Sequence, residues 1–308
     1  MPDPRFVVDE ASFDFNGFDA NEITDSLQAL TNELACLRSD GETASVLSGW
    51  GAIICIGKTD VASLLTDHLL VARDLGARLL SLLDKCTAWD DSCAEIVEPA
   101  VVVEGTPLES FGIAWVVQQQ QAGRATAVVT LKHRPYRGAF SVTNQSANSN
   151  VHFVVEPQDH PSFFRSVYSV ENVPEREFFS VASLAFPNLD FAEGLSFGRF
   201  DGTYANLKIV VVKHLSALHD LFPAAARLEN QQSRAISARI GVDVSIESSN
   251  TRKSPAKMKE RDAVFNGASF KCEWHSKIEP TRNRIHFCPI GGTSDRIVIG
   301  IFVDHLET

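Results

Sequence analysis

The chain has 308 residues, of which 44% are hydrophobic and 22% are charged, and its formal net charge is −11 at pH 7. This composition is that of a globular protein, and the acidity argues against a protein that coats nucleic acid without specificity. No apolar run reaches the length of a membrane span and the polar N-terminus lacks the pattern of a secretory signal, so we expect a cytoplasmic protein without a membrane partner. The six cysteines are too scattered for a disulfide framework, which agrees with a reducing compartment.

The first 97 residues are predicted to be mainly helical. Asp19 to Arg38 places leucine and isoleucine side chains at helical spacing and begins with acidic residues, as helix N-termini often do. A second, longer helix is predicted from Thr59 or Asp60 to about Lys85. Between them, Trp50 to Ile56 is apolar enough for a short buried strand. Gly57-Lys58-Thr59 is similar to the end of a phosphate-binding loop, but Ala52 stands where that loop needs glycine, which argues against a nucleotide triphosphatase.

The next region, residues 98–204, is predicted to be rich in strands. Short runs of β-branched and aromatic residues alternate with turn-forming residues such as Gly123-Arg124. The predicted strands are Ala100–Glu104, Gly112–Gln118, Ala125–His133, Gly138–Thr143 and Val151–Glu156. Two helical segments are expected after them, at Phe163–Val170 and Pro174–Phe186.

The last region, residues 205–308, is predicted to begin with a strand at Leu207–Val212 and two helices, at 214–229 and 230–240. A polar, basic connector at Ser245–Lys259 follows. Three antiparallel strands then complete the region, at Phe270–Ile278, Arg284–Ile290 and Arg296–Val303. We therefore expect an α+β protein with three parts: a helical N-terminal region (1–97), a β-rich middle region (98–204) and a C-terminal antiparallel sheet packed on helices (205–308).

The charge is distributed unevenly between these regions. Residues 1–250 hold 18 Lys and Arg against 32 Asp and Glu, whereas residues 251–308 hold 10 against 7. A basic end attached to an acidic body is compatible with a local RNA site at the basic end, and with a protein partner that binds the acidic N-terminal body.

Ionisable side chains are concentrated on the C-terminal strands. Successive residues of a strand point to opposite faces, so Glu273, His275 and Lys277 are predicted to share one face, and Arg284 and His286 to share one on the next strand. If the apolar faces pack together, the polar faces coincide in one basic surface that contains imidazoles. An ordinary solvated face of an antiparallel sheet has the same alternation, and that alternative stays open.

The order strand, helix, helix, connector and three antiparallel strands, with Lys and Arg on the sheet and a histidine near its end, resembles the RelE-type ribonuclease fold of bacterial toxins. The resemblance covers about residues 205–308. It implies cleavage of RNA through its own 2′-hydroxyl, without metal or cofactor. It also implies that Lys277 and Arg284 hold the phosphate, with Arg282 and Arg296 as further candidates. His305 would be the terminal acid or base, and His275, His286 and Glu273 would supply the other proton transfer. For Glu273 and Arg296, a cross-strand ion pair is the alternative.

Two other classes of function remain as alternatives. Cys272, His275, His286 and Cys288 are ligand types that zinc prefers, but residues 272 and 275 of a regular strand point to opposite faces, so we expect no stoichiometric zinc there. Cys86 and Cys93 also have no histidine near them in the sequence, so they are a weak candidate for zinc. The other alternative is a non-catalytic subunit of a bacterial defence or toxin system, which binds protein or nucleic acid.

Overall fold

The structure is a computed structural model that describes residues 4–92, 97–145, 147–290 and 295–306. Helices and mixed sheets make it an α+β protein, as predicted. Its contacts divide the chain into two compact units, Met1–Glu171 (unit 1) and Asn172–Thr308 (unit 2). These units differ from the predicted division at 97/98 and 204/205: the strands after residue 98 pair into the same sheet as the first strands, and residues 172–204 belong to unit 2. Cys93 lies outside the described residues.

Unit 1 is built on an eight-stranded sheet with the order β5-β2-β1-β8-β10-β9-β6-β7. The first five strands of this order run parallel, and the last three pair antiparallel. Their bounds are β1 (Phe6–Val8), β2 (Ala44–Val46), β5 (Thr87–Ala88), β6 (Ala100–Val103), β7 (Thr106–Glu109), β8 (Ala127–Val129), β9 (Gly138–Asn144) and β10 (Ala147–Val154). The central strands β1, β2 and β8 are buried at every position, as parallel strands covered on both faces usually are.

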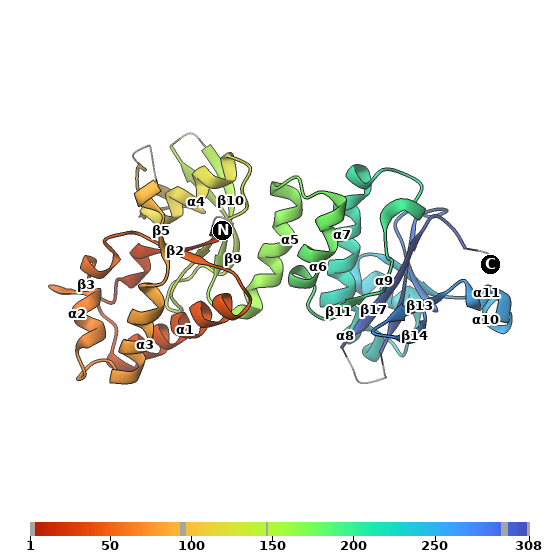
Figure 1. Cartoon of the computed structure of the whole chain (residues 1–308), viewed down its shortest axis with the longest axis horizontal. Coiled ribbons are helices and arrows are strands. Elements are labelled where there is room, and N and C mark those ends of the chain that lie inside the picture. Colours follow the sequence, from red (N-terminus) through yellow and green to blue (C-terminus); the bar gives the residue numbers. More distant parts are fainter. Residues whose placement is uncertain (1–3, 93–96, 146, 291–294, 307–308) are drawn as a thin grey trace. The chain divides into compact units, whose positions relative to one another are not determined.

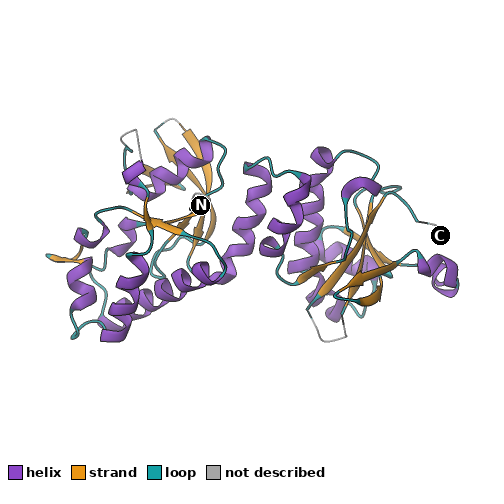
Figure 2. Cartoon of the chain, viewed as in Figure 1, coloured by secondary structure: helices purple, strands orange, loops and turns teal. Residues whose placement is uncertain are grey.

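Helices cover both faces of this sheet (Figure 2). On one face, Val7 packs in a cluster with Ile113 and Val117 of α4 (Phe111–Gln121). On the other face, the ring of Phe6 lies 5.0 Å from that of Phe163 in α5 (His160–Val170). The helix α1 (Ala20–Ser39) begins with a capping box between Asp19 and Glu22, which matches the predicted start. The remaining helices of unit 1 are α2 (Val61–Thr66), α3 (Arg73–Leu83) and the 3-10 turns η1 (Glu10–Phe13), η2 (Trp50–Ala52), η3 (Asp90–Ser92) and η4 (Pro157–Asp159).

Three local predictions in unit 1 are wrong. The single helix predicted over 59–85 is two helices, α2 and α3, because the chain turns at Asp67, whose carboxylate accepts a hydrogen bond from the Leu69 amide. The strand predicted at Gly112–Gln118 is part of α4, which Ser110 caps by accepting from the Ile113 amide. The segment Trp50–Ile56 forms η2 and β3 (Ile54–Ile56), which pairs with β4 (Thr59–Asp60) in a small separate hairpin.

Unit 2 is built on a five-stranded sheet with the order β11-β17-β16-β15-β12. The bounds are β11 (Leu189–Phe191), β12 (Asp243–Ile246), β15 (Trp274–Lys277), β16 (Arg284–Pro289) and β17 (Ile297–Val303). The predicted three-stranded meander is present as β15, β16 and β17, whose neighbours are antiparallel. The edge strand of the five-stranded sheet, β11, pairs with β17 in parallel. The strand predicted at Leu207–Val212 is wrong, because those residues lie inside the helix α7 (Tyr204–Asp220).

One face of this sheet packs on helices. Phe222, at the start of α8 (Phe222–Leu228), stacks its ring edge against Trp274 and Phe287, at centroid distances of 5.3 and 5.0 Å. His214 of α7 lies 2.7 Å from the Ser276 hydroxyl. The other helices of unit 2 before the arm are α6 (Phe178–Ala185), α9 (Ser233–Ile240), η5 (Glu175–Glu177) and η6 (Phe197–Arg199).

Among described residues no single helix is long and apolar enough to cross a membrane, and only α7 with α8, as a bent pair, passes that test.

The opposite face is covered by residues 247–273, which we call the arm. It contains α10 (Ser249–Lys253), α11 (Pro255–Lys259), β13 (Asp262–Phe265) and β14 (Ala268–Lys271), and Figure 1 shows α10 and α11 on the side of the sheet away from α6 and α7. The arm packs so closely that a Cβ on Gly300 of β17 would lie 2.2 Å from the Cys272 sulfur. The segment predicted as a polar connector is therefore a folded part of unit 2.

Candidate functional site

Four ionisable residues of the C-terminal sheet share the face under the arm, as the pleat predicts. In the antiparallel pairing of β15 and β16, His275 lies opposite His286 and Lys277 lies opposite Arg284. Residues directly opposite each other project to the same face. On β17, Ile301 and Val303 continue these two rows, opposite His286 and Arg284.

The row of His275 and His286 is buried by the arm. The two imidazoles are 7% and 0% exposed, and their ring centroids lie 5.3 Å apart. Glu247, which precedes the two helices of the arm, and Arg261, which follows them, are buried beside the imidazoles. The Glu247 Oε1 atom lies 2.9 Å from Arg261 Nε, 3.3 Å from His275 Nδ1 and 3.8 Å from His286 Nδ1. The histidines are thus part of a buried charged network, in which His286 is fully buried and His275 almost so.

The pKa values follow from this arrangement. Burial by itself raises the pKa of Glu247, but the contacts with His275 and Arg261 outweigh it and bring that pKa to about 2. Burial, and then the neighbouring His275, lower the pKa of His286 to about 3. The network therefore holds an ionised carboxylate, a guanidinium and a neutral His286 near neutral pH, and the guanidinium supplies the positive charge that the buried carboxylate needs.

The two cysteines and two histidines weighed as an alternative zinc set do not form one group of ligand atoms. Cys272 packs with Ala192, Ala263 and Cys288 in an apolar cluster, at the close approach to Gly300. The ligand atoms that do converge are those of Glu247, His275 and His286, which lie within 4.8 Å of one another. Arg261 contacts the same carboxylate oxygen at 2.9 Å, so a cation is already present beside it.

The second row, Lys277 and Arg284, is more open. The Lys277 Nζ atom lies 3.4 Å from the exposed Asp243 carboxylate of β12. Arg284 is partly buried, and its Nε atom is buried without a hydrogen-bond partner among the described residues. Two like charges thus face each other across β15 and β16, with one carboxylate near Lys277.

His305 follows β17, two residues after Val303, which lies opposite Arg284. Leu306 is buried against Ile301 and Val303, so the segment after β17 folds onto the face that carries Arg284. The Asp304 amide donates to the Arg199 carbonyl at 2.8 Å, which holds the backbone as it leaves β17. His305, between these two anchors, is exposed.

The remaining predicted residues lie away from these rows. Arg282, in the turn between β15 and β16, pairs with Glu279 at 2.6 Å and with Asp201. Arg296 forms an ion pair, as the alternative reading expected, but with Asp190 of β11 and not with Glu273. Glu273 directly precedes β15, where its carbonyl accepts from the Glu247 amide at 2.8 Å, which continues the register of β12 with β15 and places Glu273 opposite Glu247, beyond the row of His275 and His286.

The sequence reasoning did not single out a second polar cluster, in unit 1. Asp9 and Glu10 follow β1 directly, at the carboxyl end of the parallel strands and next to the point where the strand order reverses, a common place for binding sites. Glu10 accepts from the amides of Phe111 and Gly112 at the start of α4, and Asp9 accepts from the Ser110 hydroxyl at 2.8 Å. Burial, and then the charge of Glu10, raise the pKa of Asp9 to about 7. The signal in the sequence was an acidic pair directly after an apolar run.

No family model, curated protein or solved structure matches this chain.

Proposed function

We propose that unit 2 is a metal-independent RNA-cleaving module of a toxin-like or defence-system protein, with its site at Lys277, Arg284 and His305. The observation that carries the proposal is the pair Lys277 and Arg284, directly opposite each other on one sheet face. Like charges at such positions repel each other. Among described residues the only carboxylate that pairs with either of them is the exposed Asp243, so a phosphate bound between them would relieve the repulsion.

The element order of unit 2 supports the same proposal. From β11 the order is a strand, helices, β12, the arm and three antiparallel strands, which apart from β12 is the order on which the resemblance to the RelE-type toxins rests, with β11 in place of the strand expected at Leu207–Val212. The arm adds exposed cations in α10 and α11, at Arg252, Lys253 and Lys259. These side chains suit contacts with the backbone phosphates of a longer RNA.

The chemistry assigned to the site needs no metal or cofactor. The 2′-oxygen of the RNA attacks the adjacent phosphorus, the bond from phosphorus to the 5′-oxygen breaks, and a 2′,3′-cyclic phosphate and a 5′-hydroxyl form. The proton of the 2′-hydroxyl passes to solvent, and the imidazole of His305 gives a proton to the departing oxygen. Lys277 and Arg284 stabilise the negative charge that develops on the phosphate. His275 and His286, which are buried, are assigned to positioning the arm and not to proton transfer.

The test is cleavage of RNA by the full chain in the presence of a chelator. The substrates are an end-labelled single strand of mixed sequence and mRNA in a translation extract. We expect His305→Ala to lower the cleavage rate about 10²–10⁴-fold, as removal of a positioned acid or base usually does. His68→Ala is the matched control, because His68 is an exposed histidine of unit 1.

The binding of the same RNA separates the two leading functions. Lys277→Met and Arg284→Met are each expected to weaken RNA binding and to flatten its salt dependence. Wild-type chain that binds RNA in this manner but never cleaves it would favour the non-catalytic RNA-binding subunit. Wild-type chain that neither binds nor cleaves RNA would contradict the proposal, and cleavage that survives in His305→Ala would remove His305 from the site.

A further inference from the structure

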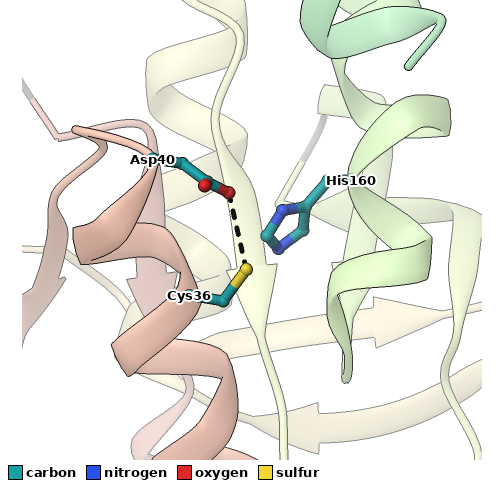
Figure 3. Close-up of side chains that lie close together, drawn as sticks. All are labelled: Cys36, Asp40 and His160. Atoms are coloured by element: carbon teal, nitrogen blue, oxygen red, sulfur yellow. Dashed lines mark hydrogen bonds between the residues drawn. The ribbon is translucent and has the colours of Figure 1, made fainter.

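Unit 1 contains a second group of side chains of the types that bind metal ions. Cys36 lies in the last turn of α1, Asp40 is the C-cap residue of this helix, and His160 lies at the start of α5. Figure 3 shows the imidazole of His160 facing the gap between the Asp40 carboxylate and the Cys36 sulfur. One ligand atom from each of the three residues lies within 4.8 Å of the others. Residues far apart in the sequence are thus brought together by the packing of α1 and α5 on the same face of the sheet.

The distance between Cys36 and Asp40 fits a tetrahedral zinc ion. The Cys36 thiol donates to the Asp40 Oδ2 atom over 3.4 Å. Zinc binds sulfur at about 2.3 Å and carboxylate oxygen at about 2.0 Å, which at a tetrahedral angle separates the two ligand atoms by about 3.5 Å. The two side chains therefore need almost no rearrangement to bind the same ion.

The buried carboxylate of Glu33 contacts the imidazole of His160. Glu33 lies one turn before Cys36 on α1, is fully buried, and its Oε1 atom contacts the Nε2 atom of His160. The other carboxylate oxygen of Glu33 is buried and has no hydrogen-bond partner among the described residues. A histidine that binds a metal usually donates its second ring N–H to a carboxylate, which fixes the tautomer and the ring orientation. This contact leaves the Nδ1 atom of His160 for the metal.

The charges of the group also favour a cation. No described Lys or Arg forms an ion pair with Glu33 or Asp40, in contrast to Glu247, which has Arg261. A bound cation would offset the two carboxylates.

We propose that Cys36, Asp40 and the Nδ1 atom of His160 form a zinc site, with Glu33 as the carboxylate that orients His160. Three protein ligands leave one position of the tetrahedron for water or a further ligand. Asp40 is exposed and Cys36 is half-buried, so this fourth position faces solvent. Sulfur, imidazole and carboxylate ligands together select zinc over magnesium or calcium. The site lies in unit 1 and does not depend on the function proposed for unit 2.

The experiment uses the full chain, stripped with a chelator and kept with a reductant that does not bind metals. It is titrated with Zn²⁺, and with Co²⁺ as a spectroscopic probe of thiolate ligation. We expect about one equivalent of metal per chain and a sulfur-to-cobalt absorption band. Cys36→Ser and His160→Gln are expected to abolish the band. Glu33→Gln is expected to keep it and to lower the affinity about 10–100-fold.

Cys86→Ser is the matched control. Cys86 is also a half-buried cysteine of unit 1 whose pKa burial raises to about 11, but it belongs to no group of metal-binding side chains among the described residues. This variant should bind metal as the wild type does. Asp40→Asn changes a ligand at an exposed position, so weaker metal binding by this variant would not be explained by a loss of the fold. A wild type without the cobalt band, or a band that persists in Cys36→Ser or disappears in Cys86→Ser, would overturn the proposal.

Discussion

Asp9 of unit 1 and Glu247 of unit 2 are both buried carboxylates, yet their pKa values move in opposite directions. Burial and the adjacent Glu10 raise the pKa of Asp9 to about 7, whereas at Glu247 the contacts with His275 and Arg261 outweigh burial and lower the pKa to about 2. Burial alone therefore does not decide the charge of such a group. At Asp9 burial is the largest cause and the contacts of the side chain do not offset it, whereas at Glu247 the contacts with His275 and Arg261 do.

The largest expected effect comes from removing the guanidinium of Arg261. Arg261→Met leaves Glu247 buried without its cation, and breaking a buried pair in this way costs about 3–5 kcal/mol of unfolding free energy. Urea unfolding measures the loss, and hydrogen exchange should localise it to peptides of β15, β16 and the arm.

Arg252→Met is the control for this change, because Arg252 is an exposed arginine of the same arm and should change the unfolding free energy by less than about 0.5 kcal/mol. Adding Glu247→Gln to Arg261→Met should restore part of the stability, since no uncompensated charge then remains. Equal stability of the two single arginine variants would mean that Arg261 does not hold the arm on the sheet.

The sequence could predict which face His275, Lys277, Arg284 and His286 share, because strand alternation depends on local spacing alone. It could not predict that the row of His275 and His286 is buried and that the row of Lys277 and Arg284 is more open. That difference depends on the arm, whose run of Lys, Arg and Ser is typical of an exposed connector, and whose buried Arg261 has no local signal. The β-branched run Leu207–Val212 is helical for a similar reason: packing of α7 on the sheet overrides a weak intrinsic preference.

The next effect is the change of stability with pH, which has opposite signs for Asp9 in unit 1 and Glu247 in unit 2. Asp9 has a folded pKa above its unfolded value, so its contribution to stability is complete below about pH 4 and is lost as the pH rises through about 7. Glu247 has a folded pKa below its unfolded value, so its contribution is present above about pH 4.5 and is lost as the pH falls toward 2.

Asp9→Asn tests the first of these statements. Its amide oxygen can still accept from the Ser110 hydroxyl and the Ala11 amide, but the side chain cannot ionise. We expect wild type to lose stability relative to the variant by about 1.4 kcal/mol for each pH unit between about pH 4 and pH 7, and the difference to level off above about pH 8. Denaturant unfolding of both chains across this range checks it. Parallel stability profiles for the two chains would show that Asp9 is ionised in the folded protein at neutral pH.

The smallest expected effect comes from an exposed pair. Asp243 and Lys277 are 3.4 Å apart with side chains 55% and 25% exposed, so Asp243→Asn should cost no more than about 1 kcal/mol in stability. The same change removes the carboxylate that competes with a bound phosphate, so RNA binding should become tighter. Thermal unfolding and a filter-binding titration measure the two effects. Weaker RNA binding by this variant would argue against a phosphate site at Lys277 and Arg284.

The parallel pairing of β11 with β17 has a consequence for synthesis. Leu189 pairs with Ile297, 108 positions later in the chain, so the sheet of unit 2 closes only after β17 has left the ribosome. At about 5–20 residues per second, the strands of unit 1 have all emerged long before that moment. Until β17 inserts, β11 and β16 each present an unpaired backbone edge, which is a template for pairing with another chain. A ribosome-bound chaperone that shields these two edges would therefore raise the yield of unit 2 more than that of unit 1.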